Sequence, residues 1–168
     1  RARILTQAAR KYKVATQMGN QGHSGDGVRD VCEWIWAGVI GEVREVHAWT
    51  NRPVWPQGIK DRPAAQPVPD TLDWDLYCGP SPLRPYNEAY HPFKWRGWWD
   101  FGAGALGDMA CHVLDPVIWA LKLKYPTSVW ACATEVYEET FPHASIIRFE
   151  FPAREGMPAV KVNWYDGG

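Results

Sequence analysis

Three ionisable side chains that could move a proton lie within one short segment that reads as a helix. Asp108 and His112 are four residues apart, so their side chains share one helix face, and Asp115 follows almost one turn later. A carboxylate beside an imidazole fixes its tautomer and raises its basicity. Such a pair can take a proton from a hydroxyl while hydride leaves the same carbon. We therefore predict His112 and Asp108 as catalytic residues, although this spacing also suits a surface salt bridge.

The stretch that precedes this segment carries side chains suited to holding a polar substrate. Lys94 and Arg96 can bind a hydroxyl or a carboxylate, and a flat aromatic ring such as that of Trp95 suits the C–H face of a sugar. With His91 and Asp115 they form the predicted substrate-binding set. The alternative is a solvated surface loop.

A third group of polar side chains follows a short apolar run at residues 14–18, which we predict to be a strand. Asn20 and His23 lie just beyond it, and loops at the carboxyl ends of strands line the ligand crevice of an α/β sheet. The sequence therefore predicts a cofactor-binding role for Asn20 and His23.

Two other site chemistries have weaker support in the sequence. A zinc reading would use His91, Asp108 and His112, but these residues lack a compact ligand spacing, so we predict no metal site. A glycosidase reading would pair Asp100 with Asp108. That reading stays open, because such pairs are set by distance in space rather than by spacing in sequence.

The composition describes an ordinary globular chain and excludes several partners. Of the 168 residues 46% are apolar and 22% charged, and the formal net charge is −1. No basic stripe favours nucleic acid, and no apolar run is long enough to span a membrane. We predict buried free thiols for the scattered cysteines, which are Cys32, Cys78, Cys111 and Cys132.

Tryptophan is unusually frequent in this chain. It holds eleven tryptophans, and five of them lie between Trp55 and Trp99 in a proline-rich segment. Their rings either stack on sugar rings or fill an irregular core, and the sequence alone does not choose between the two.

The elements that position these side chains follow from periodicity and turn residues. We predict helices over residues 1–11 and 28–36, the second capped by Asp26 and ended by Gly38. A strand over 43–51 leads into an excursion (residues 52–102) with a helical turn near 74–77. A helix over 105–122 should be kinked by Pro116. Strands over 128–137, 144–151 and 158–165 have short connections and predict an antiparallel sheet.

This order of elements predicts an α+β fold with an open, mostly antiparallel sheet and helices on one face. It should be preceded by the last strand and helix of a Rossmann-like α/β domain. We place the boundary at residue 40, with 1–40 as the end of a nucleotide-binding domain and 41–168 as a substrate and oligomerisation domain that is incomplete at its C-terminus.

Two segments resemble one protein family. GAGALGDMACHVLDPVIWAL resembles the signature helix of the glucose–fructose oxidoreductase/inositol dehydrogenase/MocA family, and VCEWIWAGVIGEVREVHAWTN resembles its entry into the substrate domain. The resemblance implies an NAD- or NADP-dependent oxidoreductase acting on a hydroxyl of a sugar, inositol or glycoside, with His112 as general acid/base and Asp108 assisting.

The resemblance also implies that this chain is truncated. The family's glycine-rich nucleotide turn and its Glu-Lys-Pro motif both belong to a preceding part and are absent here.

Two alternative functions stay open, an NAD-dependent glycoside hydrolase of the same family and a non-catalytic sugar-binding or assembly module. A homo-oligomer formed through the open sheet is expected. The cytoplasm is the default location, and export is expected if a leader precedes the chain.

We expect the isolated chain to bind no NADH with useful affinity, because it lacks the glycine-rich turn that would hold the pyrophosphate. Titration of NADH, followed by its fluorescence, tests this expectation. Saturable binding at micromolar NADH would contradict it.

Overall fold

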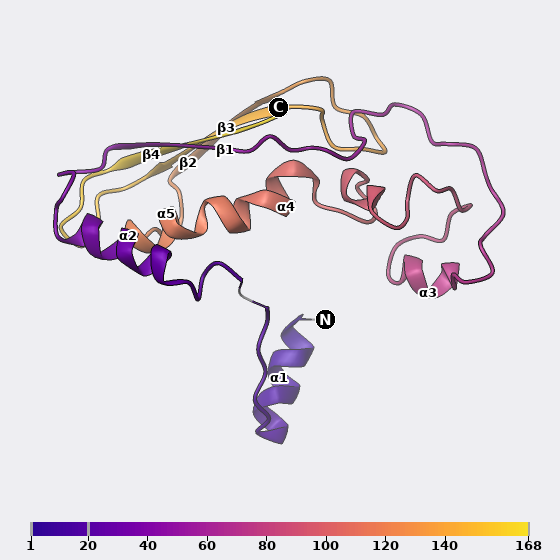
Figure 1. Cartoon of the computed structure of the whole chain (residues 1–168), viewed down its shortest axis with the longest axis horizontal. Helices are drawn as coiled ribbons and strands as arrows, with labels where there is room; N and C mark the ends of the chain where they lie inside the picture. The colour runs from indigo at the N-terminus through magenta and orange to yellow at the C-terminus, as the bar shows by residue number, and fades with distance from the viewer. Residues whose placement is uncertain (1, 20, 168) are drawn as a thin grey trace.

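The computed structural model describes residues 2–19 and 21–167, which form six helical elements and four strands (Figure 1). The helices are α1 (Ala2–Tyr12), α2 (Asp26–Trp36), α3 (Trp74–Cys78), the 3₁₀ helix η1 (Lys94–Gly97), α4 (Gly104–Val113) and α5 (Asp115–Ala120). The strands are β1 (Glu45–Trp49), β2 (Ser128–Ala133), β3 (Ser145–Phe151) and β4 (Val160–Asp166).

The four strands form one open sheet in the order β1-β4-β3-β2. β2 pairs with β3 and β3 with β4 in antiparallel register, whereas β1 runs parallel to β4. The helices α2, α4 and α5 lie along one side of this sheet (Figure 1). The predicted α+β fold with a mostly antiparallel open sheet is therefore confirmed.

Alternate side chains of the sheet form the main core against the helices. Val160 and Val162 of β4 are 2% exposed and pack with Leu121 and Leu123, which follow α5. Phe149 and Phe151 of β3 point to the same side. Exposure therefore alternates along β3, as expected for a strand with one covered face.

The opposite side of the sheet, called here the open face, carries two rows of side chains. One row runs Trp130, Arg148, Asn163 and His47, and the next runs Cys132, Ile146, Tyr165 and Trp49. Within the described residues no helix covers this face (Figure 1). Trp49 is 70% exposed and Trp130 53% exposed, so the face presents large apolar surface to solvent.

The strand predicted at residues 14–18 is wrong. This segment is exposed and has no regular structure, and α1 before it buries no residue. Figure 1 shows α1 projecting away from the sheet. A strand needs a neighbour to satisfy its backbone groups, and no described strand lies beside these residues.

The helix predicted over 105–122 is interrupted as expected. α4 ends at Val113, Leu114 caps it, and α5 begins at Asp115 with Pro116 in its first turn. Proline supplies no N–H to continue the helical ladder, but it fits the first turn of a new helix.

The cap predicted for α2 is wrong, since Gly25 is its N-cap and Asp26 pairs instead with Arg29.

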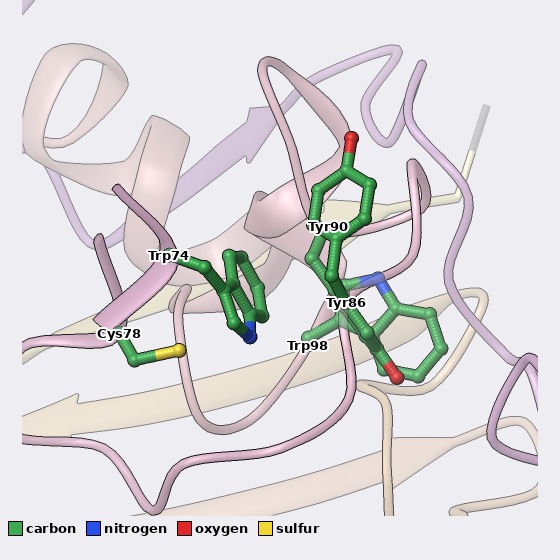
Figure 2. Packing of buried hydrophobic residues seen from close by; sticks show 5 residues of the cluster. All are labelled: Trp74, Cys78, Tyr86, Tyr90 and Trp98. Atoms are coloured by element: carbon green, nitrogen blue, oxygen red, sulfur yellow. The ribbon is translucent and has the colours of Figure 1, made fainter. Parts of the chain in front are cut away.

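The excursion (residues 52–102) builds a second core from aromatic side chains. Trp74 and Cys78 of α3 pack with Tyr86, Tyr90 and Trp98 (Figure 2). The indole N–H of Trp74 donates to the carbonyl of Arg84, and that of Trp98 to the carbonyl of Ala89. These two tryptophans fill an irregular core, and their polar edges are used inside the protein.

The prediction of buried cysteines holds for two of the four. Cys32 and Cys78 are buried, and burial raises the pKa of both thiols. Cys111 and Cys132 are exposed, which corrects the expectation for them. Cys132 lies on the edge strand β2, where every residue is exposed.

A charged network joins this second core to the loop after β2. Arg84 is 7% exposed and pairs with Asp100 and, through Nη1 at 2.9 Å, with Glu139. Arg62 binds the other oxygen of the Glu139 carboxylate. The hydrogen bond from Arg62 and the charge of Arg84 hold the pKa of Glu139 below its ordinary value.

A depressed carboxyl pKa stabilises the fold at neutral pH, and this contribution disappears as the pH falls through the lowered pKa. We expect Glu139→Gln to reduce the free energy of unfolding at pH 7 by about 1.5–3 kcal/mol, because two charged hydrogen bonds lose their anion. As the pH falls below the ordinary pKa of a glutamate, the free energy of unfolding of the wild type should decrease more steeply than that of the variant. Urea unfolding at several pH values measures both effects.

Glu138→Gln is the matched control, because the neighbouring Glu138 is exposed. It should leave stability and its pH dependence unchanged. Equal behaviour of the two variants would contradict the role given to the Glu139 network.

Candidate active-site cleft

A cleft of about 880 Å³ lies between the segment before α2 and the junction of α4 with α5. Gln21, Gly22 and His23 line it from one side, and Cys111 and His112 line it from the other. The remaining lining residues are Met18, Gly19, Val28, Ala110, Asp115, Pro116 and Ile118. Three predicted site residues, His23, His112 and Asp115, are therefore brought together across a large sequence distance.

Asn20, which was predicted to bind cofactor, lies outside the described residues. Its neighbours on both sides, Gly19 and Gln21, line the cleft.

Among the described residues, Asp108 makes no hydrogen bond or salt bridge with His112. Its carboxylate instead accepts a hydrogen bond from Arg96 Nε at 3.2 Å. The two residues share a helix face, but the 3₁₀ helix η1 packs on α4 and brings a permanent cation within reach of the carboxylate. Within the described residues, no carboxylate pairs with His112.

Arg96 is enclosed by aromatic rings as well as paired with Asp108. Its guanidinium lies 4.5 Å from the ring centroid of Trp95, 4.6 Å from that of Phe93 and 5.8 Å from that of Trp55. This enclosure and the ion pair fix η1 against α4. Arg96, which the sequence predicted as a substrate ligand, therefore also holds η1 in place.

The other predicted substrate ligands of this stretch also lie outside the cleft lining. Lys94 and Trp95 belong to η1, and His91 packs edge-on against Tyr77 with ring centroids 5.0 Å apart. Of the predicted substrate-binding set, the structure places only Asp115 in the cleft.

Asp115 binds a partner that the sequence did not indicate. Its two carboxylate oxygens lie 3.0 and 2.8 Å from Nδ1 of His23, which is 92 residues earlier in the chain. The imidazole of His23 also stacks on Trp119, with ring centroids 4.5 Å apart and ring planes 21° from parallel. Asp115 and Trp119 are one helical turn apart on α5, so α5 fixes both an edge and a face of the His23 ring.

Two features of the cleft were missed from the sequence. Cys111 was expected to be buried, yet it is exposed on the cleft wall beside His112. The His23–Asp115 contact was missed because it joins distant segments. The i, i+4 spacing of Asp115 and Trp119 was the only local signal, and it fits many helix surfaces equally well.

The described residues hold no group of three or more His, Cys, Asp or Glu side chains placed to bind a metal ion. None of the described helices is long and apolar enough to cross a membrane.

The N-terminus of α2 does not fit a pyrophosphate. It follows an irregular segment rather than a strand, and Asp26 places a negative charge in its first turn. A phosphate needs a positive field at such a helix start, and the carboxylate opposes that field.

Comparison with known families agrees with the α+β fold. Residues 33–148 match the model of the oxidoreductase family, C-terminal alpha/beta domain, of the glucose–fructose oxidoreductase/inositol dehydrogenase/MocA group. The chain belongs to this oxidoreductase family. No curated protein matches the chain.

Proposed function

We propose that this chain is the substrate domain of an NAD(P)-dependent oxidoreductase that acts on a hydroxyl of a sugar, inositol or glycoside. The observation that carries the proposal is the cleft at the α4–α5 junction, where the family's signature helix places His112 opposite His23 and Asp115. A polyhydroxylated ring needs a pocket of this size lined by a few hydrogen-bonding groups and apolar walls.

The chain's own residues account for the substrate half of the reaction. His112 is exposed to the cleft, where its imidazole can take the proton of a substrate hydroxyl or return it. Met18, Val28 and Ile118 supply apolar walls. A bound nicotinamide cofactor would supply the hydride acceptor, and its pyrophosphate would be held outside the described residues.

We expect His112→Ala to lower the turnover of the complete oxidoreductase by about 10²- to 10⁴-fold, the usual effect of removing a general acid/base. The assay follows NAD(P)H formation with a panel of sugars and inositols. Because His112 is exposed, the fold should be unchanged by circular dichroism. His143→Ala is the control, since this exposed histidine lies outside the cleft.

The same assay separates the alternatives. Turnover of a glycoside without accumulation of NADH would show the family's hydrolase chemistry instead. Retained sugar affinity in His112→Ala, with no turnover in the wild type, would show a binding module.

The open face supports a second proposal, that two copies of this chain associate through it. A monomer rarely leaves several large aromatic side chains exposed on one surface, and the pairing of like faces is the usual geometry of a two-fold dimer. Trp49, Trp130 and Ile146 supply the apolar area, and Arg148 and Glu45 supply polar groups that fix register.

We expect Trp130→Glu to convert a dimer into a monomer, because it buries a charge within the pairing surface. Size-exclusion chromatography with light scattering measures the mass of each form. Trp34→Glu is the matched control, since Trp34 is 59% exposed on α2, on the other side of the sheet. A wild-type chain that is monomeric at high concentration would overturn the proposal.

A further inference from the structure

His23 is held in a way that determines which of its ring nitrogens carries a proton. Both oxygens of Asp115 lie within hydrogen-bond distance of Nδ1, so this nitrogen donates and carries the hydrogen. In the neutral ring Nε2 then keeps its lone pair and acts as an acceptor. Within the described residues Nε2 has no hydrogen-bond partner, and the ring lines the cleft.

The ring is also held in orientation. Trp119 stacks on its face and Asp115 binds its edge, so rotation about either side-chain torsion would lose one of the two contacts. The His23 side chain is nevertheless 46% exposed, which leaves its Nε2 edge accessible to a ligand. A preorganised acceptor loses little conformational entropy when it binds.

His112 in the same cleft lacks this support. The carboxylate of Asp108, four residues before it, binds Arg96, and that of Asp115, three residues after it, binds His23. The two imidazoles therefore differ in kind, since one has a fixed tautomer and the other does not. A fixed acceptor can discriminate between ligand groups, because it accepts from a hydroxyl and repels a carbonyl or ether oxygen.

We propose that His23 is a specificity-determining residue whose Nε2 accepts a hydrogen bond from a hydroxyl of the ligand, with Asp115 and Trp119 as its positioning residues. The proposal rests on the proposed function for the class of ligand, a polyhydroxylated ring. It adds that this ring must present an unsubstituted hydroxyl to the His23 side of the cleft, apart from any hydroxyl on which His112 acts.

The first test measures the tautomer of His23 in the chain labelled with ¹⁵N-histidine. Long-range proton–nitrogen spectra should show hydrogen on Nδ1 and a lone pair on Nε2. Asp115→Asn should lose this preference, because an amide N–H₂ facing Nδ1 favours the opposite tautomer. Asp108→Asn is the control and should leave His23 unchanged, since Asp108 contacts Arg96. Hydrogen on Nε2 in the wild type would overturn the proposal.

The second test measures ligand contact without any turnover. Diethylpyrocarbonate modifies unprotonated imidazoles, and mass spectrometry reports the rate at each histidine. D-Glucose, D-galactose and myo-inositol serve as probes beside their fully O-methylated derivatives, which keep the ring but donate no hydrogen bond. At least one free polyol should slow modification of His23, its methylated form should not, and His143 should be unaffected by either.

The outcomes separate this inference from the proposed function. Protection of His112 without protection of His23 would refute the role of His23 and leave the polyol cleft standing. Equal protection of His23 by free and methylated forms would also refute it. Protection of neither histidine by any probe would count against the proposed function itself and therefore against both.

A kinetic readout distinguishes binding from a structural role. We expect His23→Ala to raise KM for the favoured polyol about tenfold, the loss of one hydrogen bond of about 1.4 kcal/mol, with little change in kcat. It should affect KM far less for an analogue in which that hydroxyl is replaced by hydrogen. A fall in kcat with unchanged KM would contradict the assignment, as would equal effects on both substrates.

Discussion

Pro116 has no backbone N–H, so the helical ladder that begins at Gly104 cannot run unbroken to Ala120. The break at Leu114 produces two short helices with different tasks. α4 faces η1 and uses Asp108 to hold Arg96, whereas α5 faces the segment before α2 and uses Asp115 and Trp119 to hold His23. The cleft lies where the two helices meet, and His112 stands at the end of the first. A continuous helix would place Asp108, His112 and Asp115 along one stripe and would remove this division.

The excursion has a core of its own, which explains why so long a segment can remain ordered with little regular structure. Its tryptophans use their rings for packing and their N–H groups for internal carbonyls, so the buried ones have no face left for a sugar. Arg84 supplies the charge that joins this core to Asp100 and to Glu139 after β2. The excursion therefore acts as a support that carries η1 to α4, and through Arg96 it fixes the wall behind the cleft.

The sequence predicted what depends on local pattern and missed what depends on contacts between distant segments. The short runs 144–151 and 158–165, separated by turns, identified β3 and β4, and Pro116 located the helix break, because both signals act over a few residues. Residues 14–18 have the composition of a strand, but a strand also requires a partner. Asp108 and His112 have the right spacing for a pair, but the carboxylate of Asp108 binds Arg96, which belongs to η1. The contact of His23 with Asp115 spans 92 residues, and no local pattern encodes it.

Three acidic residues considered for the chemistry, Asp100, Asp108 and Asp115, differ in their partners. Asp100 pairs with Arg84 and Asp108 with Arg96. An arginine cannot give up its proton in a protein, so these two ion pairs hold charge in place and have no protonation switch. A glycosidase pair made of Asp100 and Asp108 would need one carboxyl free to donate a proton, and each is instead committed to a guanidinium. Asp115 pairs instead with His23, whose side chain lines the cleft. Asp115 is therefore the carboxylate of the three whose partner reaches the cleft.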